Sequence, residues 1–479
     1  MNDTDSRRSF IQKSTVLAAS ALAGGTPAGA QVVGKAKLTL PHPVLTPAED
    51  FQNVARGNPK PHTLRGEALV KARLTPETWQ LEITADPLVE PPFVKQPAQL
   101  AKPLTMEEGN AIDLPALLEL GKKRGVKFIK AMQCLNIATP LGQGLWEGVP
   151  LRDVLGLCGK MNNVRRIYYR GFHNNDPKQI FQSSLSYTQV METPPGELPV
   201  FLAYKLNGEP LPLLRGGPVR MIVPWAHGFK SIKWLREIFV TNDHRINDTY
   251  ALQNNDPDSY LKTAAYVDDG AKRVAAGQTA VLTGLVISGL SGVKRVEYWV
   301  RKVEGDPGRL ADDAPELLRG PWKPCKILPP PAWNEVLPEG VKPTDILGFD
   351  KTTGQPRSWP LRYGMASYQA EIGGLQPGNY EVRARAVDLN DFAQPSPLSH
   401  RHSANNHIQF CSFFLSFFFF FSSSLSFLSP PLPPLPPSLP SPPPPLPPPS
   451  PSPPPPPLPP PPPLSPSPPS PPFPFSFPP

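Results

Sequence analysis

The last 68 residues of the chain, which follow Cys411, use only four residue types: Phe, Leu, Ser and Pro. They hold 33 of the 71 prolines and no charged residue. Proline fixes φ and lacks a backbone N–H, so runs of it are extended and cannot join a packed core. The codons of all four residue types can begin with two pyrimidines, as in a translated polypyrimidine repeat. We therefore interpret 411–479 as a low-complexity tail, either disordered or a gene-model artefact.

A membrane anchor in this tail is the alternative interpretation. The run Phe413–Leu428 is rich in Phe and Leu but is interrupted by serines, and it is shorter than the about 20 residues that a spanning helix needs. We expect no membrane span. All 48 basic and 40 acidic residues precede the tail, and the net charge of +8 is modest. Because no dense basic block is present, we also expect no nucleic-acid partner.

The first 30 residues have the features of an export signal. Ser6–Lys13 contains a twin-arginine pattern, Ser14–Gly25 is a weakly apolar run, and Ala28–Ala30 offers a small-residue cleavage site. We predict a twin-arginine signal peptide over 1–30 and export to the periplasm. That pathway carries folded proteins, which favours a cofactor inserted before export.

The remaining sequence divides near residue 262 into two predicted domains. The first, 31–262, mixes helix and strand signals: Leu114–Arg124 has a helix start at Asp113 and a stop at Gly125. Strands are predicted in it over Val126–Met132, Val164–Tyr169 and Val219–Val223. The sequence therefore predicts an α+β chain that begins with a mixed α/β domain.

The second predicted domain, 263–410, carries strand signals only, and these suggest an immunoglobulin-like sandwich. The predicted strands are Thr279–Ile287, Val293–Val303, Ser367–Ile372 and Tyr380–Val387. The proline-rich stretch Pro307–Pro360 is predicted to be a long loop inserted between strands.

Common catalytic motifs are absent from the sequence: a nucleotide-binding glycine loop, a zinc-protease helix, a nucleophile elbow and a haem-attachment Cys-x-x-Cys-His. The four cysteines (Cys134, Cys158, Cys325 and Cys411) are too scattered for a disulfide framework or a paired zinc site. Cys134 follows a predicted strand and opens a loop, a place that suits a soft-metal ligand or a nucleophile. The alternative for Cys134 is a buried structural thiol.

A cluster of anion-binding groups occupies 215–235. Gly216 and Gly217 allow a ligand to approach the backbone, and the basic side chains near them can donate charge-assisted hydrogen bonds to a phosphate. The alternative is a solvated basic face beside a strand. The residues that make up the cluster are Arg215, Arg220, Lys230, Ser231 and Lys233.

Several segments resemble the sulfite oxidase superfamily. Cys134 with Gly144–Leu155 resembles the molybdenum-ligand segment of that family, and Leu202–Pro212 resembles its next signature. Gly217–Trp234 resembles its pterin-phosphate segment, and Gly378–Asp388 its C-terminal dimerisation domain. The segments follow one another in the family's order.

The resemblance implies a domain that binds one molybdenum–molybdopterin per chain, followed by the immunoglobulin-like dimerisation domain. Cys134 would be the thiolate ligand of molybdenum. Tyr260 would be the active-site tyrosine, with Tyr250 as the alternative. By the same resemblance, Arg220, Ser231 and Lys233 would contact the pterin phosphate, and Arg56, Asn58 and His62 would belong to an early cofactor-binding segment. Arg215, which stands where the family usually has histidine, and Lys230 complete the predicted cofactor-binding residues.

The sequence departs from the family after the ligand cysteine, where Leu135–Thr139 lacks the arginine that grips sulfite. Arg170 is a further candidate cation. Three hypotheses therefore stand: oxidation of sulfite or a related small oxyanion; reduction of S-oxides or N-oxides, as in reductases of methionine sulfoxide; and a secreted binding protein without catalysis. For the enzymes we expect an external electron carrier of cytochrome c type and a homodimer formed through the sandwich.

Overall fold

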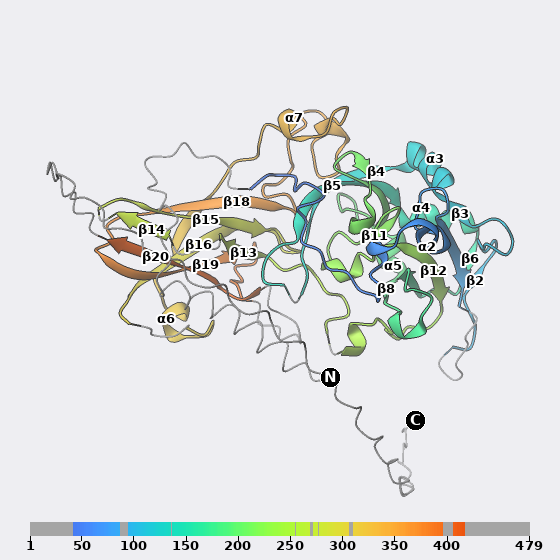
Figure 1. Cartoon of the computed structure of the whole chain (residues 1–479), viewed down its shortest axis with the longest axis horizontal. Coiled ribbons are helices and arrows are strands. Elements are labelled where there is room, and N and C mark those ends of the chain that lie inside the picture. The colour runs from blue at the N-terminus through green and yellow to red at the C-terminus, as the bar shows by residue number, and fades with distance from the viewer. Residues whose placement is uncertain are drawn as a thin grey trace, which may run out of the picture. The chain divides into compact units, whose positions relative to one another are not determined.

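The computed structural model describes residues 42–86, 94–135, 137–253, 255–268, 272–275, 277–305, 310–395 and 406–416. The predicted signal peptide and all of the tail after Ser416 lie outside these residues. The first part of the chain is mixed α/β and the second is all β apart from short helices, so the predicted fold class is confirmed (Figure 1).

Two five-stranded sheets form the first part. The first sheet has the order β3 (Ile112–Asp113), β1 (Gln80–Ala85), β12 (Leu235–Thr241), β7 (Arg166–Gly171) and β8 (Gln182–Ser186). The second has the order β10 (Glu209–Pro210), β9 (Phe201–Leu206), β5 (Gly142–Pro150) and β4 (Val126–Met132), with β11 (Arg220–Ile222) also paired to β9. A small ribbon joins β2 (Gln99–Leu100) and β6 (Met161–Asn162). The helices of this part are α2 (Gly66–Lys71), α3 (Leu114–Arg124), α4 (Leu151–Leu155) and α5 (Tyr187–Met191).

Helix α3 and strand β4 have the bounds that the sequence predicted. The side chain of Asp113 caps the helix by accepting a hydrogen bond of 2.8 Å from the backbone N–H of Ala116. Pro115 lies in the first turn, where its missing N–H costs nothing. Gly125 ends the helix with extended backbone, and β4 begins at the next residue.

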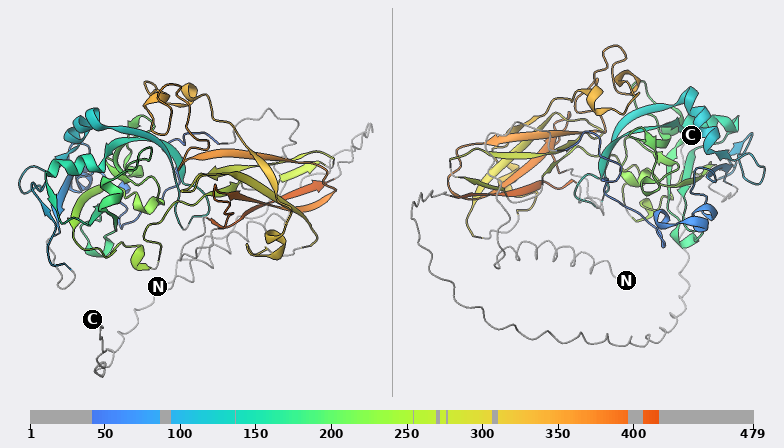
Figure 2. Two further views of the ribbon diagram at one scale, coloured as in Figure 1. Left: turned by 180° about the vertical axis from the view of Figure 1, so that it is seen from behind. Right: turned by 45° about the horizontal axis from the view of Figure 1, so that its top comes forward.

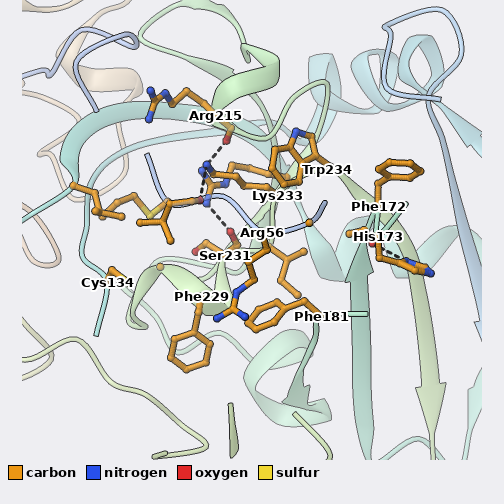
Figure 3. Close-up of a pocket in the computed structure, with 18 of the residues that line it drawn as sticks. Arg56, Cys134, Phe172, His173, Phe181, Arg215, Phe229, Ser231, Lys233 and Trp234 are labelled. Atoms are coloured by element: carbon orange, nitrogen blue, oxygen red, sulfur yellow. Dashed lines mark hydrogen bonds between the residues drawn. The ribbon is translucent and has the colours of Figure 1, made fainter. Parts of the chain in front are cut away.

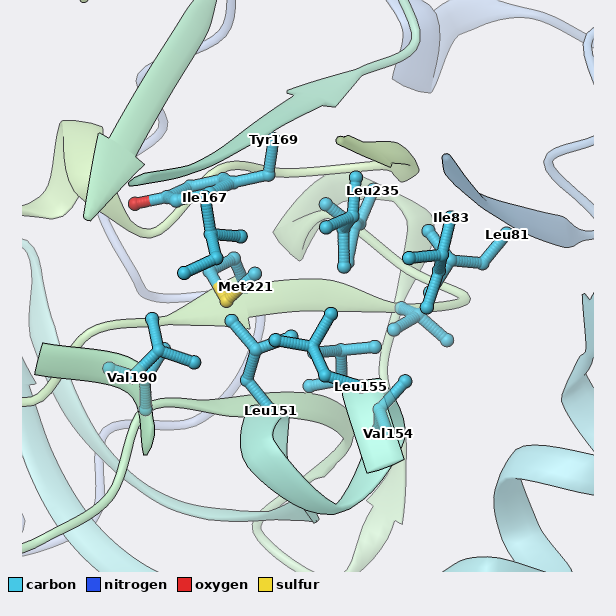
Figure 4. Packing of buried hydrophobic residues seen from close by; sticks show 14 of the residues in the cluster. Leu81, Ile83, Leu151, Val154, Leu155, Ile167, Tyr169, Val190, Met221 and Leu235 are labelled. Carbon is cyan, nitrogen blue, oxygen red and sulfur yellow. The ribbon is translucent and has the colours of Figure 1, made fainter. Parts of the chain in front are cut away.

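The main core of this part lies between the first sheet and the elements of the second. Leu81 from β1, Ile167 from β7 and Leu235 from β12 meet Leu151 from α4 and Met221 from β11, all fully buried (Figure 4). This contact fixes β11 over the first sheet. The loop that follows β11 carries the predicted phosphate-binding residues, so the core holds that loop in place.

The second part is an eight-stranded sheet that curls on itself into two facing layers (Figures 1 and 2). Val286 of one layer and Val382 of the other share a buried apolar cluster. The strand order is β13 (Ala264–Val267), β15 (Ala280–Ile287), β18 (Met365–Ile372), β17 (Lys323–Ile327), β16 (Arg295–Val303), β19 (Gly378–Val387), β20 (Gln409–Ser416) and β14 (Lys272–Ala275).

The sequence predicted that the stretch Pro307–Pro360 is a long loop, and this prediction was incomplete. The stretch contains α6 (Pro315–Leu318), α7 (Trp333–Val336) and strand β17, which joins the two layers by pairing with β16 and β18. Trp333 and Phe349 pack on Ile129 of β4 and Leu145 of β5. Leu337 and Ile346 belong to the same buried cluster, so the apolar residues of this stretch pack it against β4 and β5.

Strand β20 extends past the predicted domain end at residue 410. It pairs with β19 from Gln409 to Leu415 and in parallel with β14 from Phe413 to Ser416. Phe413 is fully buried in the sandwich core, whereas Phe414 points outward and is 36% exposed. The first residues of the Phe/Leu/Ser/Pro tail are therefore part of the fold, because they alternate in and out as a strand requires.

None of the helices in the described ranges is both long and apolar enough to cross a membrane. All four cysteines are free thiols, as their spacing indicated.

The β20 strand can be tested with two neighbouring residues. Phe413→Ala removes a fully buried ring and should lower the free energy of unfolding by about 3–5 kcal/mol. Phe414→Ala, the matched control, should change it by less than about 1 kcal/mol because that ring is partly exposed. Urea denaturation of both variants measures the difference. Equal, small effects would show that β20 is not part of the core.

Candidate active site

A deep pocket opens in the first part of the chain, with about 990 Å³ of space outside the protein atoms, part of it open to solvent (Figure 3). Its walls come from the segment before α2, the end of β4, the end of β7 and the loop after β11. The lining residues include Phe51, Arg56, Met132, Cys134, Phe172, His173, Gln179, Phe181, Arg215, Arg220, Phe229, Ser231, Lys233, Trp234 and Tyr250.

Cys134 lies two residues after the end of β4 and is 5% exposed. The loop that carries it is held by Gln133, whose side-chain amide donates to the carbonyl oxygens of Cys134 (3.0 Å) and Ile137 (2.8 Å). The backbone N–H of Gly228 also donates to the carbonyl of Gln133 at 2.7 Å. The thiol therefore has a fixed place in the pocket wall.

Three cations gather at one end of the pocket, which we call the cation end: Arg215, Arg220 and Lys233. Figure 3 shows two of them, Arg215 and Lys233. Arg220 donates to the carbonyl oxygens of Arg215 (2.8 Å) and Ser231 (2.6 Å), and its guanidinium lies 5.3 Å from the ring of Trp146. Among the described residues, none of the three cations forms an ion pair with a carboxylate. Positive charge is thus buried here without an acidic partner.

The electrostatic cost of this arrangement appears in the pKa values. Burial, with Arg220 and Arg215 nearby, lowers the pKa of Lys233 to about 6. Burial and Arg215 lower the pKa of Arg220 to about 9. Lys130 on β4 is fully buried, and burial together with Arg220 lowers its pKa to about 7. An anion bound at the cation end would reverse these shifts.

The backbone around the cations requires a glycine at 216. Gly216 has φ +103°, and a Cβ there would come within 2.7 Å of the Lys233 side chain. The N–H of Trp234 donates to the carbonyl of Gly216 at 2.9 Å. Ser231 accepts a hydrogen bond from the N–H of Val223 at 3.1 Å, and within the described residues no acceptor takes its hydroxyl hydrogen. Ser231 can therefore donate to a ligand.

Residues 42–56, which we call the N-terminal strap, cross the pocket wall. The strap is tied down by hydrogen bonds from the N–H of Thr46 to the carbonyl of Gln143 (2.7 Å) and from the N–H of Gln52 to that of Leu141 (2.8 Å). Lys233 in turn donates to the carbonyl of Val54 at 3.0 Å. The strap thus supplies neutral oxygens to the cation end.

The opposite end of the pocket, which we call the aromatic end, surrounds Arg56 with rings. The guanidinium of Arg56 lies 4.3 Å from the ring centre of Phe181 and 4.9 Å from that of Tyr250, and it donates to the Tyr250 hydroxyl at 2.5 Å. Phe229 packs edge-on to Tyr250 at 4.4 Å. Burial raises the pKa of Tyr250, and the neighbouring Arg56 opposes that rise. Arg56, Tyr250 and Cys134 therefore line one pocket.

Six of the predicted site residues line this pocket: Cys134, Arg56, Arg215, Arg220, Ser231 and Lys233. Of the two tyrosines, the pocket contains Tyr250 and not Tyr260. Tyr260 instead forms an isolated bridge with Ala226, and the chain from Leu261 leads into the sandwich.

Three other predicted residues lie outside the lining of the pocket. Lys230 is buried, and its amine contacts the Asp248 carboxylate at 2.6 Å, which satisfies its charge internally. The exposed Asn58 uses its backbone to bond Gln179. His62 stacks on Trp234 at 6.3 Å, so it supports the wall without forming it.

Arg170, the further candidate cation, is also outside the lining. It donates to Gln182 at 2.9 Å, approaches Glu237 and stacks on Phe239. No site role was predicted for Phe51, Phe172, Phe181, Phe229 or Trp234, which also line the pocket. Apolar residues in a sequence indicate burial, and nothing in their pattern separates a ring in a pocket wall from one in the core.

The residues present fit a cofactor with an anionic phosphate and a soft metal. The Nε atoms of Arg215 and Arg220 are buried without a hydrogen-bond partner among the described residues. A buried guanidinium nitrogen without an acceptor is costly unless a ligand supplies one. Cys134 offers a thiol in the wall of the same pocket. Together they can hold a phosphate and one metal–thiolate bond.

Residues 68–249 match the family model described as the oxidoreductase molybdopterin binding domain. Residues 68–249 thus form a molybdopterin-binding oxidoreductase domain, so the chain is a molybdenum oxidoreductase and its cofactor is molybdenum–molybdopterin.

The chain is similar over part of its length to several nitrate reductases. A nitrate reductase (NAD(P)H) of Betula pendula is 28% identical over 247 residues, which are 48% of this chain and 26% of the relative. A nitrate reductase (NADPH) of Fusarium oxysporum is 33% identical over 114 residues, 24% of this chain and 12% of the relative. The chain thus spans about a quarter of the relatives' length or less.

Among solved structures, the sulfane dehydrogenase SoxCD from Paracoccus pantotrophus is similar with a TM-score of 0.47 and 18% identity, covering 73% of this chain and 82% of that one.

The buried lysine predicts a pH dependence of stability in the cofactor-free chain. The pKa of Lys233 is about 6 in the folded chain against an ordinary 10.5, so the unfolded chain binds more protons above pH 6. The free energy of unfolding should therefore rise between pH 6 and pH 8. Lys233→Met should flatten that rise in urea denaturation.

Lys122→Met on the surface of α3 is the control, because Lys122 is 70% exposed and should leave the pH dependence unchanged. If the free energy of unfolding rose equally with pH in the original chain and in Lys233→Met, the rise would not originate from Lys233.

Proposed function

We propose that the chain is an oxidoreductase that oxidises a small sulfur oxyanion of sulfite type by two-electron oxygen-atom transfer at a molybdenum held by Cys134. The observation that carries this proposal is the position of Arg56. It is a cation at the open side of the pocket that has no carboxylate partner among the described residues, and it donates to the hydroxyl of Tyr250, which lines the same pocket as Cys134. An anionic substrate would neutralise that charge.

The chain's own residues have separate tasks in this proposal. The cofactor, when bound, supplies the oxygen-atom transfer chemistry. Arg220, Lys233 and Ser231 hold its phosphate at the cation end. Arg56 orients the substrate anion, and the Tyr250 hydroxyl, which already accepts a hydrogen bond from Arg56, can donate its own hydrogen to a substrate oxygen.

Reduction of an S-oxide is a second candidate function, favoured by the rings at the aromatic end. Phe181, Phe229 and Tyr250 form an apolar wall that an uncharged organic S-oxide could contact. The two directions of oxygen transfer are distinguished by assaying sulfite with an oxidising dye and methionine sulfoxide with a reduced dye.

A secreted binding protein without catalysis is not supported, because the first part is an oxidoreductase domain.

Export, the electron partner and the assembly state are further proposals. Export is supported by the twin-arginine pattern in Ser6–Lys13. For the electrons we propose a separate carrier of cytochrome c type. Phe410 and Phe414 are exposed on the outer face of β20, which supports a homodimer formed through the sandwich.

The roles of Cys134 and Lys233 can be separated by assaying pterin and turnover independently. Cys134→Ser should lower turnover by at least about 100-fold, because the thiolate ligand is lost. It should keep its pterin, measured by fluorescence after release, because the phosphate contacts lie at the cation end. Lys233→Ala should lose the pterin itself.

Cys325→Ser, on strand β17 of the sandwich, is the matched control and should retain both pterin and turnover. Normal turnover of sulfite by Cys134→Ser, with molybdenum present, would overturn the proposed function.

A further inference from the structure

The aromatic end of the pocket contains one cation only, among the described lining residues. Arg215, Arg220 and Lys233 belong to the cation end, where burial, with the other two cations nearby, lowers the pKa of Lys233. Figure 3 shows Arg56 with Phe181 and Phe229 on one side of Ser231, and Arg215 with Lys233 on the other. A substrate bound at the aromatic end would therefore meet a single positive charge.

The guanidinium of Arg56 is held in one orientation. Phe181 and Tyr250 lie against it at 4.3 and 4.9 Å, and Tyr250 accepts its hydrogen bond at 2.5 Å. Among the described residues no other acceptor takes its remaining N–H groups, and Arg56 is exposed, so these donors are open to a ligand. A planar fork of donors of this kind matches two oxygens of one anionic group. One guanidinium balances one negative charge, which favours a monoanion over a dianion.

The rest of the aromatic end is apolar. Phe181 and Phe229 are both half-buried, so each keeps part of its ring open to the pocket. They meet Tyr250 edge-on with ring centres 5.4 and 4.4 Å from its own. An inorganic oxyanion has no carbon surface to place against these rings, whereas an organic substituent beside the anionic group would cover them.

We infer that the substrate is an organic sulfinate, R–SO₂⁻, with its oxygens on Arg56 and its apolar group R against Phe181 and Phe229. Sulfinates are monoanions near neutral pH and combine one charge with a carbon substituent. The inference rests on the proposed function, because it uses the same pocket and the same oxygen-atom transfer.

The reaction balances with water as the oxygen source: R–SO₂⁻ + H₂O gives R–SO₃⁻ + 2 H⁺ + 2 electrons. One sulfur–oxygen bond forms, both O–H bonds of the water break, and sulfur is oxidised by two electrons. The electrons leave to two molecules of a one-electron acceptor, the class of carrier already proposed.

The experiment compares benzenesulfinate, methanesulfinate and sulfite on the cofactor-loaded full chain, with ferricyanide as the acceptor. We expect kcat/KM for benzenesulfinate to exceed that for sulfite by at least about 10-fold, because an apolar group is recognised. Phe229→Ala should lower kcat/KM for benzenesulfinate by about 10-fold more than it lowers kcat/KM for sulfite. Arg56→Gln should lower both.

Phe239→Ala is the matched control, since Phe239 stacks on Arg170 at 4.6 Å in the same way but outside the pocket lining. This variant should leave kcat/KM for all three substrates unchanged. Binding of benzenesulfonate, the product, can be measured by calorimetry without an electron acceptor. Its heat-capacity change should be negative, and Phe229→Ala should make that change smaller.

Turnover of sulfite with no turnover of either sulfinate would overturn this inference and leave the proposed function standing. Equal efficiency for all three, unchanged in Phe229→Ala, would also overturn it. Molybdenum-loaded chain that turns over none of them would overturn the proposed function and this inference together.

Discussion

The burial of Arg215, Arg220 and Lys233 side by side, with no ion pair to a carboxylate among the described residues, is the constraint on which the site depends. Positive charge in a low-dielectric interior is unfavourable unless something neutralises it. The chain partly compensates with carbonyl oxygens from the N-terminal strap and from Ser231. The positive charge that these oxygens do not compensate favours the binding of an anionic cofactor. Because the cofactor binds the folded chain, it also stabilises the fold by mass action.

The scaffold around these cations explains how the charge is tolerated. Met221 on β11 lies in the main core, one residue from Arg220, so the strand cannot move away from its neighbours. Trp146 of β5 presents its ring to the Arg220 guanidinium. Strand β11 thus holds Arg220, and the connection between β11 and β12 carries Ser231 and Lys233, while Arg56 lies on an irregular segment at the opening.

Local signals in the sequence were sufficient for regular elements. Asp113, Pro115 and Gly125 fix the bounds of α3, and the resemblance to a known family identified Cys134 and three of the pocket cations. The direction of side chains in irregular backbone was not predictable. Lys230 and Lys233 are three residues apart, yet one pairs with Asp248 and the other faces the pocket. The direction of the Lys230 side chain depends on Asp248, and only the tertiary fold brings Asp248 next to Lys230.

Strand β20 also sets the order in which the sandwich can be completed. It lies between β19 and β14, so both of those strands present unpaired edges until residues up to Ser416 have left the ribosome. Unpaired sheet edges are templates for association with other chains. A product terminated before Gln409 would therefore be released with two open edges, and such shortened chains would be prone to aggregate even though the molybdopterin-binding part precedes the break.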